Sequence, residues 1–385
     1  MMRFEEVYGQ WGGGRLTQQE AARILGVSDR TFRRYIYRYE EEGLEGLYDK
    51  RIARASHRCA PVDEVCRLTE VYRDRYRGWN VTHFYSFYRR RHGGGRSYTW
   101  VKNKLQEATL VAKAPGRGRH RRRRERAPIQ GMILHQDGST HQWVAGKYWD
   151  LIVTMDDATN EHYSMFFVEQ EGTVSSFQGV EDVIEQHGFF CSLYTDRAGH
   201  YWNTPEAGGK VDRHNLTQFG RAMHQLGIEM IPAYSPEARG RSERTFRTHQ
   251  DRLVKELAGE GITTMQEANC YLRDVYLPAY NEEFTVAPVE KGSAFVSVSL
   301  LGQEIRDVLC EHHTRVVGND NCVSFEGKRL QIPPNRYRLH YVKVKVRVHR
   351  YPDGSLAVFH GPRRLADYEA DGRPKKQSRA DEVAA

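Results

Sequence analysis

Between residues 129 and 257, short apolar runs and amphipathic stretches follow one another in an order that constrains the fold more than any other feature. The segments MILHQDGSTHQW, KYWDLIVTMDDATN and EHYSMFFVEQ read as three consecutive strands separated by turn residues. The second has the nearly continuous apolar run of a buried strand. A helix follows in GTVSSFQGVEDVIEQHG, then a strand in FFCSLYTDRAGHY, a helix and a short strand in NLTQFGRAMHQLGIEMIPAYS, and a helix in ERTFRTHQDRLVKEL.

This succession is the order of an α/β ribonuclease H-like fold, in which the first and fourth strands lie side by side. Asp137 is on the first strand and Asp196 ends the fourth, so their carboxylates are expected to converge. His135 lies two residues before Asp137 and therefore on the same strand face, where it either supports that carboxylate or only packs. The pair Asp156 and Asp157 falls in DDATN, a composition typical of a turn.

A third carboxylate can come from AYSPEARGRSERTFRTHQDRL, which contains two glutamates. Glu237 follows Pro236 in a stretch rich in Ser, Arg and Gly, whereas Glu243 begins a run with the apolar spacing of a packed helix face. A metal ligand on a rigid helix keeps its geometry better than one on a loop, so Glu243 is favoured and Glu237 is the alternative. Four nearby arginines are expected to contact phosphates, unless they form a solvated helix face: Arg239, Arg241, Arg244 and Arg247.

The positive charge of the chain is concentrated at its N-terminal end. Residues 1–126 hold 29 Lys and Arg against 15 Asp and Glu, a net charge of +14, so the rest of the chain carries −6 of the total of +8. This asymmetry favours a polyanionic partner such as nucleic acid for the N-terminal part, although a merely soluble basic surface is the alternative.

LTQQEAARILGVSDRTFRRYIYRYEEEG has the pattern of a helix-turn-helix unit. Thr17 and Glu20 form a capping box, a short turn follows, and Ser28 can cap a second helix. The buried face of that helix is expected to contain Phe32, Ile36 and Tyr39. Four residues of its exposed face suit contacts in a DNA major groove, although helix pairs with Gly turns also occur without DNA: Arg30, Thr31, Arg33 and Arg34.

A second helix-turn-helix unit is predicted from PVDEVCRLTEVYRDRY, which opens with Pro at a first helical position, and from VTHFYSFYRRRH and SYTWVKNKLQEATL. Its expected DNA-facing residues are Tyr98, Trp100, Lys102 and Lys104, of which the two aromatic residues can equally belong to the core. The following KAPGRGRHRRRRERAP lacks apolar periodicity. It is interpreted as a flexible linker whose Arg121, Arg122, Arg123 and Arg124 follow a phosphate backbone.

Near the C-terminus, CVSF, KRLQI, YVKVKVRVHRYPDG and SLAVFHG are short alternating stretches. They predict a small all-β barrel in which YVKVKVRV buries one face and presents Lys343, Lys345 and Arg347 on the other. A generic hairpin module with a soluble face is the alternative. The tail DGRPKKQSRADEVAA is expected to be disordered.

Cysteine content and hydropathy favour a cytoplasmic protein that is not inserted in a membrane. The six cysteines form no CxxC pair, the first residues lack a signal-peptide core, and no run of 18 apolar residues occurs. Two sets of residues have the chemistry of zinc ligands, but neither has the spacing of a structural zinc site. They are His57, Cys59 and Cys66, and Cys310, His312, His313 and Cys322.

Three segments together resemble a known family: HQDGS at 135–139, YTDRAGHYW at 194–202, and the whole of 216–257. They resemble transposases of the DDE type with a retroviral-integrase-like core, most closely the ISNCY group of bacterial insertion-sequence enzymes. In such families the third carboxylate lies in a G..ER motif after an SP(Q/E) segment, which implies Glu243 here. The resemblance makes Asp137, Asp196 and Glu243 the catalytic, metal-binding residues.

The resemblance further implies two Mg²⁺ or Mn²⁺ ions per active site, with Asp137 shared between them. The implied partners are double-stranded DNA, both as terminal inverted repeats and as target, and further copies of the chain in a dimer or higher multimer on DNA. The implied location is the bacterial cytoplasm, at the nucleoid. Two alternatives are a catalytically silent DNA-binding regulator derived from such an enzyme, and an RNA-cleaving ribonuclease H, which has no need of two N-terminal DNA-binding units.

The expected protein is therefore multidomain, with N-terminal all-α helix-turn-helix units, a central α/β ribonuclease H-like catalytic core and a C-terminal small all-β barrel. The predicted boundaries are 1–54 and 55–114 for the two helix-turn-helix units, 115–128 for the linker, 129–290 for the core, 291–318 for a connecting segment, 319–368 for the barrel and 369–385 for the tail.

Overall fold

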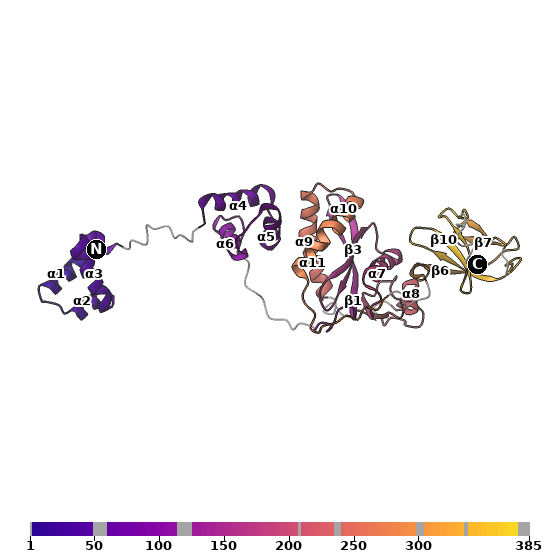
Figure 1. The fold of residues 1–385 in the computed structure, drawn as a ribbon, viewed down its shortest axis with the longest axis horizontal. Helices are drawn as coiled ribbons and strands as arrows, with labels where there is room; N and C mark the ends of the chain where they lie inside the picture. The colour runs from indigo at the N-terminus through magenta and orange to yellow at the C-terminus, as the bar shows by residue number, and fades with distance from the viewer. Residues whose placement is uncertain are drawn as a thin grey trace. The chain divides into compact units, whose positions relative to one another are not determined.

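The computed structural model describes residues 2–48, 60–113, 125–206, 209–234, 240–297, 304–334 and 338–375 (Figure 1). These residues form two compact units. The first comprises the described parts of Met1–Arg77 and Tyr88–Lys113, and the second those of Gly78–Phe87 and Ala114–Ala385. Within the described ranges, no helix combines the length and the apolar character needed to span a bilayer.

The N-terminal helices are α1 (Met2–Gly12), α2 (Gln18–Leu25) and α3 (Asp29–Glu42), followed by a short 3-10 helix (Gly43–Leu47). The predicted capping box of Thr17 and Glu20 is present, and the Ser28 hydroxyl accepts a hydrogen bond from the Thr31 amide. The helices enclose a small core with Phe32 and Ile36 at its centre. The helix-turn-helix is thus confirmed, and α1, which the sequence interpretation missed, covers this core with Phe4 and Val7.

The next three helices are α4 (Val62–Arg75), α5 (Val81–His92) and α6 (Tyr98–Glu107). Ser97 caps α6 as predicted, by accepting a hydrogen bond from the Trp100 amide. Pro61, however, occupies the N-cap of α4 and not its first helical position. Each of these helices has an apolar face, since Leu68 on α4, Phe84 on α5 and Leu105 on α6 are fully buried.

The segment that enters α5 belongs to the same compact unit as the central sheet and contacts the helices of that unit. The Nε2 atom of His83 lies 2.7 Å from a carboxylate oxygen of Glu256, and both side chains are buried. Ser86 donates a hydrogen bond of 2.7 Å to Glu283. Trp79 covers the His83 ring, with the two ring centroids 4.0 Å apart.

The central sheet has five strands in the order β3-β2-β1-β4-β5. The strands are β1 (Ile133–Val144), β2 (Lys147–Asp156), β3 (His162–Val168), β4 (Ser192–Thr195) and β5 (Glu229–Pro232). β1, β2 and β3 pair antiparallel, whereas β4 runs parallel to β1 and β5 parallel to β4. The predicted order of strands and the adjacency of the first and fourth are therefore confirmed.

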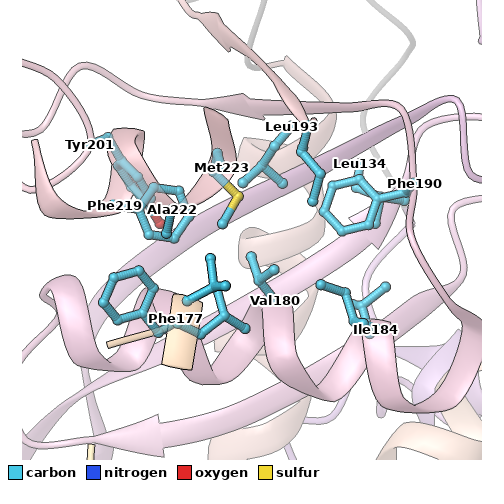
Figure 2. Close-up of a cluster of buried hydrophobic side chains, with 14 of the residues drawn as sticks. Leu134, Phe177, Val180, Ile184, Phe190, Leu193, Tyr201, Phe219, Ala222 and Met223 are labelled. Atoms are coloured by element: carbon cyan, nitrogen blue, oxygen red, sulfur yellow. The ribbon is translucent and has the colours of Figure 1, made fainter. Parts of the chain in front are cut away.

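Helices cover both faces of this sheet. On one face α7 (Thr173–His187) and α8 (Gln218–Leu226) pack against it. Figure 2 shows the side chains of Phe177, Val180 and Ile184 on α7 meeting apolar side chains of β1, β4 and α8. The approach is close at Gly179, where a Cβ atom would lie 2.4 Å from the buried Gln136 amide nitrogen. This contact explains why α7 has a glycine at that position despite its low helix propensity.

The opposite face is covered by α9 (Gly240–Gly259), α10 (Met265–Tyr271) and α11 (Leu277–Phe284), with a π-helical turn, Leu272–Tyr276, between the last two. The predicted helix face of α9 is confirmed, since Phe246, Leu253 and Leu257 pack in one cluster with the sheet. α10 and α11 complete that cluster: they pack on β3, next to α9, which packs on β1.

The C-terminal strands follow a short helix, α12 (Ile305–Val308). They are β6 (Glu311–Val316), β7 (Cys322–Phe325), β8 (Lys328–Gln331), β9 (Lys345–Arg350), β10 (Leu356–His360) and β11 (Arg363–Tyr368). They form a four-stranded sheet, β11-β10-β9-β6, and a two-stranded sheet, β7-β8.

The predicted closed barrel is not confirmed, because both sheets are open among the described residues and β6 and β11 stand at the edges of the larger one. β6 begins before the predicted boundary at residue 319 and pairs with β9. The strand predicted in YVKVKVRV starts only at Lys345, because Lys343 has a positive φ of 64°, which interrupts the extended conformation.

Candidate active site

Asp137 and Asp196 are brought together by the parallel pairing of β1 with β4. The last residues paired between the two strands are His135 and Tyr194; Asp137 lies two residues beyond this pair on β1, and Asp196 lies two residues beyond it, just after β4 ends. Neighbouring strands are about 4.8 Å apart, a distance at which two carboxylates can bind the same ion. Both residues line one hollow in the surface, which Ser242 of α9 also lines.

The first turn of α9 stands beside this pair of aspartates. Ser242 and Phe246 line a second hollow together with Asp137, and Gln250 donates a hydrogen bond of 3.1 Å to the hydroxyl of Ser139. α9 therefore runs along β1 in the same direction as the strand. Glu243 follows Ser242 and is exposed. It precedes Gln250 by seven residues, about two helical turns, and so lies on the same stripe of α9.

The alternative third ligand, Glu237, lies outside the described residues. The structure thus brings the two aspartates together and puts the first turn of α9 at the same place. Glu243 is in that turn, as the sequence interpretation requires of a third ligand.

The pKa of the buried Tyr201 is affected by nearby carboxylates. Burial raises the pKa of Tyr201 well above its ordinary value, and the carboxylates of Glu171, Asp137 and Asp196 raise it further. The Tyr201 hydroxyl donates a hydrogen bond of 3.2 Å to Gln136. Three acidic groups therefore lie near one buried phenol, so their charges act on the same small region.

Glu171 is an acidic residue of this region that the sequence interpretation missed. Its carboxylate lies against the backbone of β1 at Gly138, where an added Cβ atom would be 2.3 Å from one carboxylate oxygen. The other oxygen is 3.5 Å from Nε2 of His200. Glu171 directly follows the turn after β3 and belongs to no recognisable motif, so only the folded sheet brings it close.

The carboxylates of the two aspartates in the DDATN segment have different hydrogen-bond partners. Asp156 accepts hydrogen bonds from the amide and hydroxyl of Thr159, at 2.8 and 2.9 Å, so the turn interpretation is confirmed for it. Asp157 instead turns its carboxylate inward, where it accepts a 2.7 Å hydrogen bond from Nε2 of His135 and pairs with Arg241. The turn interpretation does not account for Asp157.

Asp157 is ionised despite its burial. Burial opposes ionisation, but hydrogen bonds from His135, from the Ala127 amide and from Arg241 outweigh it and lower the pKa of the carboxyl well below its ordinary value. For His135, the structure supports the interpretation that it carries a polar contact and does not only pack, because its ring nitrogen and the Asp157 oxygen are both buried.

Some of the residues expected to contact DNA are exposed in the structure, and others are half-buried. On α3, Arg30, Arg33 and Arg34 are exposed, and Thr31 is half-buried with its hydroxyl 2.9 Å from that of Ser28. The other exposed members of the predicted set are Tyr98, Arg244, Arg247, Lys343, Lys345 and Arg347. Lys102 and Trp100 are half-buried. These residues remain predictions as DNA contacts.

Three of the predicted cations that the structure describes have partners within the chain. Lys104 pairs with Glu107 at 2.7 Å, and Arg347 donates a hydrogen bond of 2.7 Å to the Gly361 carbonyl. Arg241, expected to contact phosphates, is instead directed at Asp157 and is mostly buried. Arg121, Arg122, Arg123, Arg124 and Arg239 lie outside the described residues.

Of the residues with zinc-ligand chemistry, Cys310 and His312 lie close to His349, a residue outside the predicted sets. His312 and His349 are cross-strand partners on β6 and β9, and their rings are stacked, with centroids 3.8 Å apart and planes 12° from parallel. Parallel rings direct their nitrogen lone pairs along separate planes, so the geometry is that of packing and not of a shared ion.

The other predicted zinc-type residues have different environments. The Cys322 thiol donates a 3.0 Å hydrogen bond to Oε1 of Gln331. Nε2 of His313 lies 3.3 Å from Oε2 of Glu311. Cys66 is exposed on α4, whereas His57 and Cys59 lie outside the described residues.

The N-terminal part of the chain matches a family model for a winged helix-turn helix over residues 9–65. A cryo-electron-microscopy structure of a simian T-cell lymphotropic virus intasome, in complex with PP2A regulatory subunit B56 gamma, is similar over 70% of this chain and 88% of that one, with 14% identity and a TM-score of 0.33. A likeness this distant carries no argument about function.

Two curated relatives are similar over most of the chain. "Putative transposase y4bF" of Sinorhizobium fredii (strain NBRC 101917 / NGR234) is 31% identical over 351 residues, which cover 90% of this chain and 75% of that protein. The transposase for insertion sequence IS1202 of Streptococcus pneumoniae is 26% identical over 306 residues, 70% of this chain and 65% of that protein. The chain belongs to the family of insertion-sequence transposases.

Proposed function

We propose that this transposase binds the ends of an insertion sequence, cleaves the DNA there to expose 3′-hydroxyls, and joins these to target DNA by metal-dependent phosphoryl transfer. The observation that supports the proposal is that Asp137, Asp196 and Ser242 of the first turn of α9 line one hollow. Two carboxylates in one hollow form an arrangement for which a merely DNA-binding protein has no need.

The two carboxylates in this hollow, together with Glu243 in the adjacent turn of α9, fit a hard divalent cation. Mg²⁺ and Mn²⁺ prefer carboxylate oxygens, and Asp137, Asp196 and Glu243 supply only such oxygens. Asp137 would be shared between two ions, while Asp196 and Glu243 would each complete one site. A pair of such ions, when bound, stabilises the attacking and leaving oxygens of an in-line displacement.

Two displacements follow from this arrangement. In the first, water attacks the phosphorus at the end of the element, and the bond to the 3′-oxygen breaks, which leaves a 3′-hydroxyl on the element and a 5′-phosphate on the flanking strand. In the second, that 3′-hydroxyl attacks a target phosphodiester and releases the 3′-oxygen of the target strand. The chain's own residues orient the phosphate and hold the charged groups, and no covalent intermediate with the protein forms.

The partner of the N-terminal units in this proposal is double-stranded DNA, first as terminal inverted repeats and then as target. α3 presents exposed arginines on the face opposite Phe32 and Ile36, as a helix that reads the major groove does. The predicted segments 1–54 and 55–114 would be the end-binding units, 129–290 the catalytic core, and 319–368, extended to include β6, a further DNA-binding module.

The direct test is incubation of the full chain with a labelled duplex that carries one terminal repeat, in the presence of MgCl₂ and a plasmid target. We expect strand cleavage at the repeat end, followed by covalent transfer of the labelled strand to the plasmid. Both products should disappear when EDTA replaces MgCl₂. Specific binding of the duplex without either product would instead identify a silent DNA-binding protein and overturn the proposal.

We also expect the protein to act as a dimer or higher multimer assembled on two DNA ends. Each chain supplies one Asp137 and one Asp196 to the hollow, whereas joining both ends of an element requires two 3′-hydroxyls to react together. Sedimentation of the protein with end DNA should give at least two chains per complex. A strictly 1:1 complex that still joined both ends would contradict this expectation.

A further inference from the structure

The buried carboxylate of Asp157 joins three segments that are far apart in the sequence. From β1, Nε2 of His135 lies 2.7 Å from Oδ1 of Asp157. From the end of the linker, the Ala127 amide donates a 2.8 Å hydrogen bond to Oδ2. From the first turn of α9, the Arg241 guanidinium pairs with Oδ1 and also donates to the Asp157 carbonyl at 3.0 Å.

The two side chains that meet at Asp157 come from the two segments that carry the proposed ligands Asp137 and Glu243. His135 precedes Asp137 by two residues on β1, and Arg241 precedes Glu243 by two residues on α9. Asp157 itself is fixed to β1, because its amide donates a 2.9 Å hydrogen bond to the Ile133 carbonyl. One buried group therefore links the strand that carries one proposed ligand to the helix turn that carries another.

Arg241 also contacts the chain on the other side of this link. Its second terminal nitrogen donates a 3.1 Å hydrogen bond to the Glu125 carbonyl, so the guanidinium spans from Asp157 to the end of the linker. Such a planar fork with several donors holds two partners at once in a fixed geometry. Removal of either charged member would leave the other buried or half-buried without its main partner.

We infer that Asp157, through Arg241 and His135, is a positioning residue that sets the first turn of α9 against the end of β1 and so fixes the distance between the ligands Asp137 and Glu243. Asp157 does not touch DNA or metal in this role. The inference rests on the proposed function, because it concerns the assembly of the same metal site. It extends that function by naming a group whose loss loosens the site while all three ligands remain.

The variant Asp157→Asn tests the inference, because it keeps the shape of the side chain and removes its charge. An amide cannot accept from His135, Arg241 and Ala127 together, since one end of it is a donor. Loss of a partner that orients metal ligands typically costs roughly 10- to 100-fold in metal affinity or activity. We expect a loss of that size in cleavage at limiting MgCl₂, a higher MgCl₂ concentration for half-maximal rate, and unchanged affinity for end DNA.

The matched control is Asp156→Asn, a buried aspartate in the same turn whose carboxylate binds Gly131 and Thr159 and not α9. If Asp157 only stabilises the fold, both variants should lower the melting temperature and neither should change the MgCl₂ requirement. A shift in the MgCl₂ requirement for Asp157→Asn alone supports positioning. An unchanged requirement in Asp157→Asn, with wild-type protein active, overturns the inference and leaves the proposed function intact.

A second variant changes Arg241, the more exposed member of the same ion pair. Arg241→Gln should reproduce the MgCl₂ shift, and the double variant Asp157→Asn with Arg241→Gln should be no worse than the more affected single variant, because both remove one link. If Asp157→Asn does not fold, Arg241→Gln alone decides the question. Additive losses in the double variant would mean that the two residues act separately and would reject the inference. Inactive wild-type protein would count against the proposed function itself.

Discussion

Replacement of Asp137 or Asp196 by Asn is expected to remove end cleavage and joining, with a loss on the order of 10³-fold or more, while affinity for end DNA is retained. The loss should be large because each carboxylate supplies charge at the point where the phosphate reacts, and an amide of the same shape supplies none. Cleavage of a labelled end duplex measures the loss, and a gel shift with the same duplex measures binding.

The losses at these two positions should not add. Asp137 and Asp196 face the same hollow and act as one unit, so the double variant should be about as inactive as either single variant. Asp274→Asn is the control, because that carboxylate is 57% exposed and pairs with its neighbour Arg273. Activity within a few-fold of wild type in Asp137→Asn would contradict the proposed site.

The same assay decides between the two glutamates near the start of α9. Glu243→Gln should be as severe as the aspartate variants, because Glu243 lies in the first turn of α9, beside the hollow. Glu237→Gln should be mild, because the proposal assigns the third metal-binding carboxylate to Glu243. Full activity in Glu243→Gln together with loss in Glu237→Gln would reverse the assignment.

The sequence allowed prediction of the parts of the fold that depend on local patterns. Apolar runs ended by turn residues located the five strands of the core, and the capping box at Thr17 located the start of α2. The adjacency of Asp137 and Asp196 also followed, because the order of elements determined which strands are neighbours. These features depend on residues close together in the chain or on the topology of one known fold.

The missed elements depend on contacts that are distant in sequence. β6 is mostly polar along EHHTRV and reads as a loop, yet it is a strand because it pairs with β9 about 35 residues later. Among the described side chains of α1, only Phe4 and Val7 are buried, which is too few for a clear helical period. The predicted barrel failed for the opposite reason: alternating strands indicate sheets, but alternation says nothing about whether the edges of those sheets meet.

The roles of charged residues were the hardest to predict. Arg241 stands among three other arginines and looks like one more phosphate contact, whereas its partner Asp157 looks like a turn residue. Neither pattern contains information about the other, since 84 residues separate them. Only the packing of α9 along β1 makes them neighbours. Sequence patterns thus pointed to the proposed ligands but missed the contact between Asp157 and Arg241 next to them.

Recognition of DNA ends is expected to depend on α3. If α3 enters the major groove, binding of the full chain to end DNA should depend steeply on salt, because arginines that neutralise phosphates release counterions. With 6–10 such contacts, affinity should fall by roughly 10³- to 10⁵-fold between about 50 and 200 mM salt. The exposed side chains of Arg33 and Arg34 belong to the face of α3 that would make these contacts.

The double variant Arg33→Ala with Arg34→Ala should therefore weaken binding and reduce the slope of log affinity against log salt by about 2, one unit for each arginine that no longer neutralises a phosphate. The matched control removes the same charge from two exposed arginines elsewhere, Arg273 and Arg373, and should leave the slope closer to that of wild type. Fluorescence anisotropy with end DNA and random DNA measures both quantities. Equal slopes in the two double variants would show that α3 does not contact the phosphates, and equal affinity of wild-type protein for the two DNAs would remove the claim of end recognition.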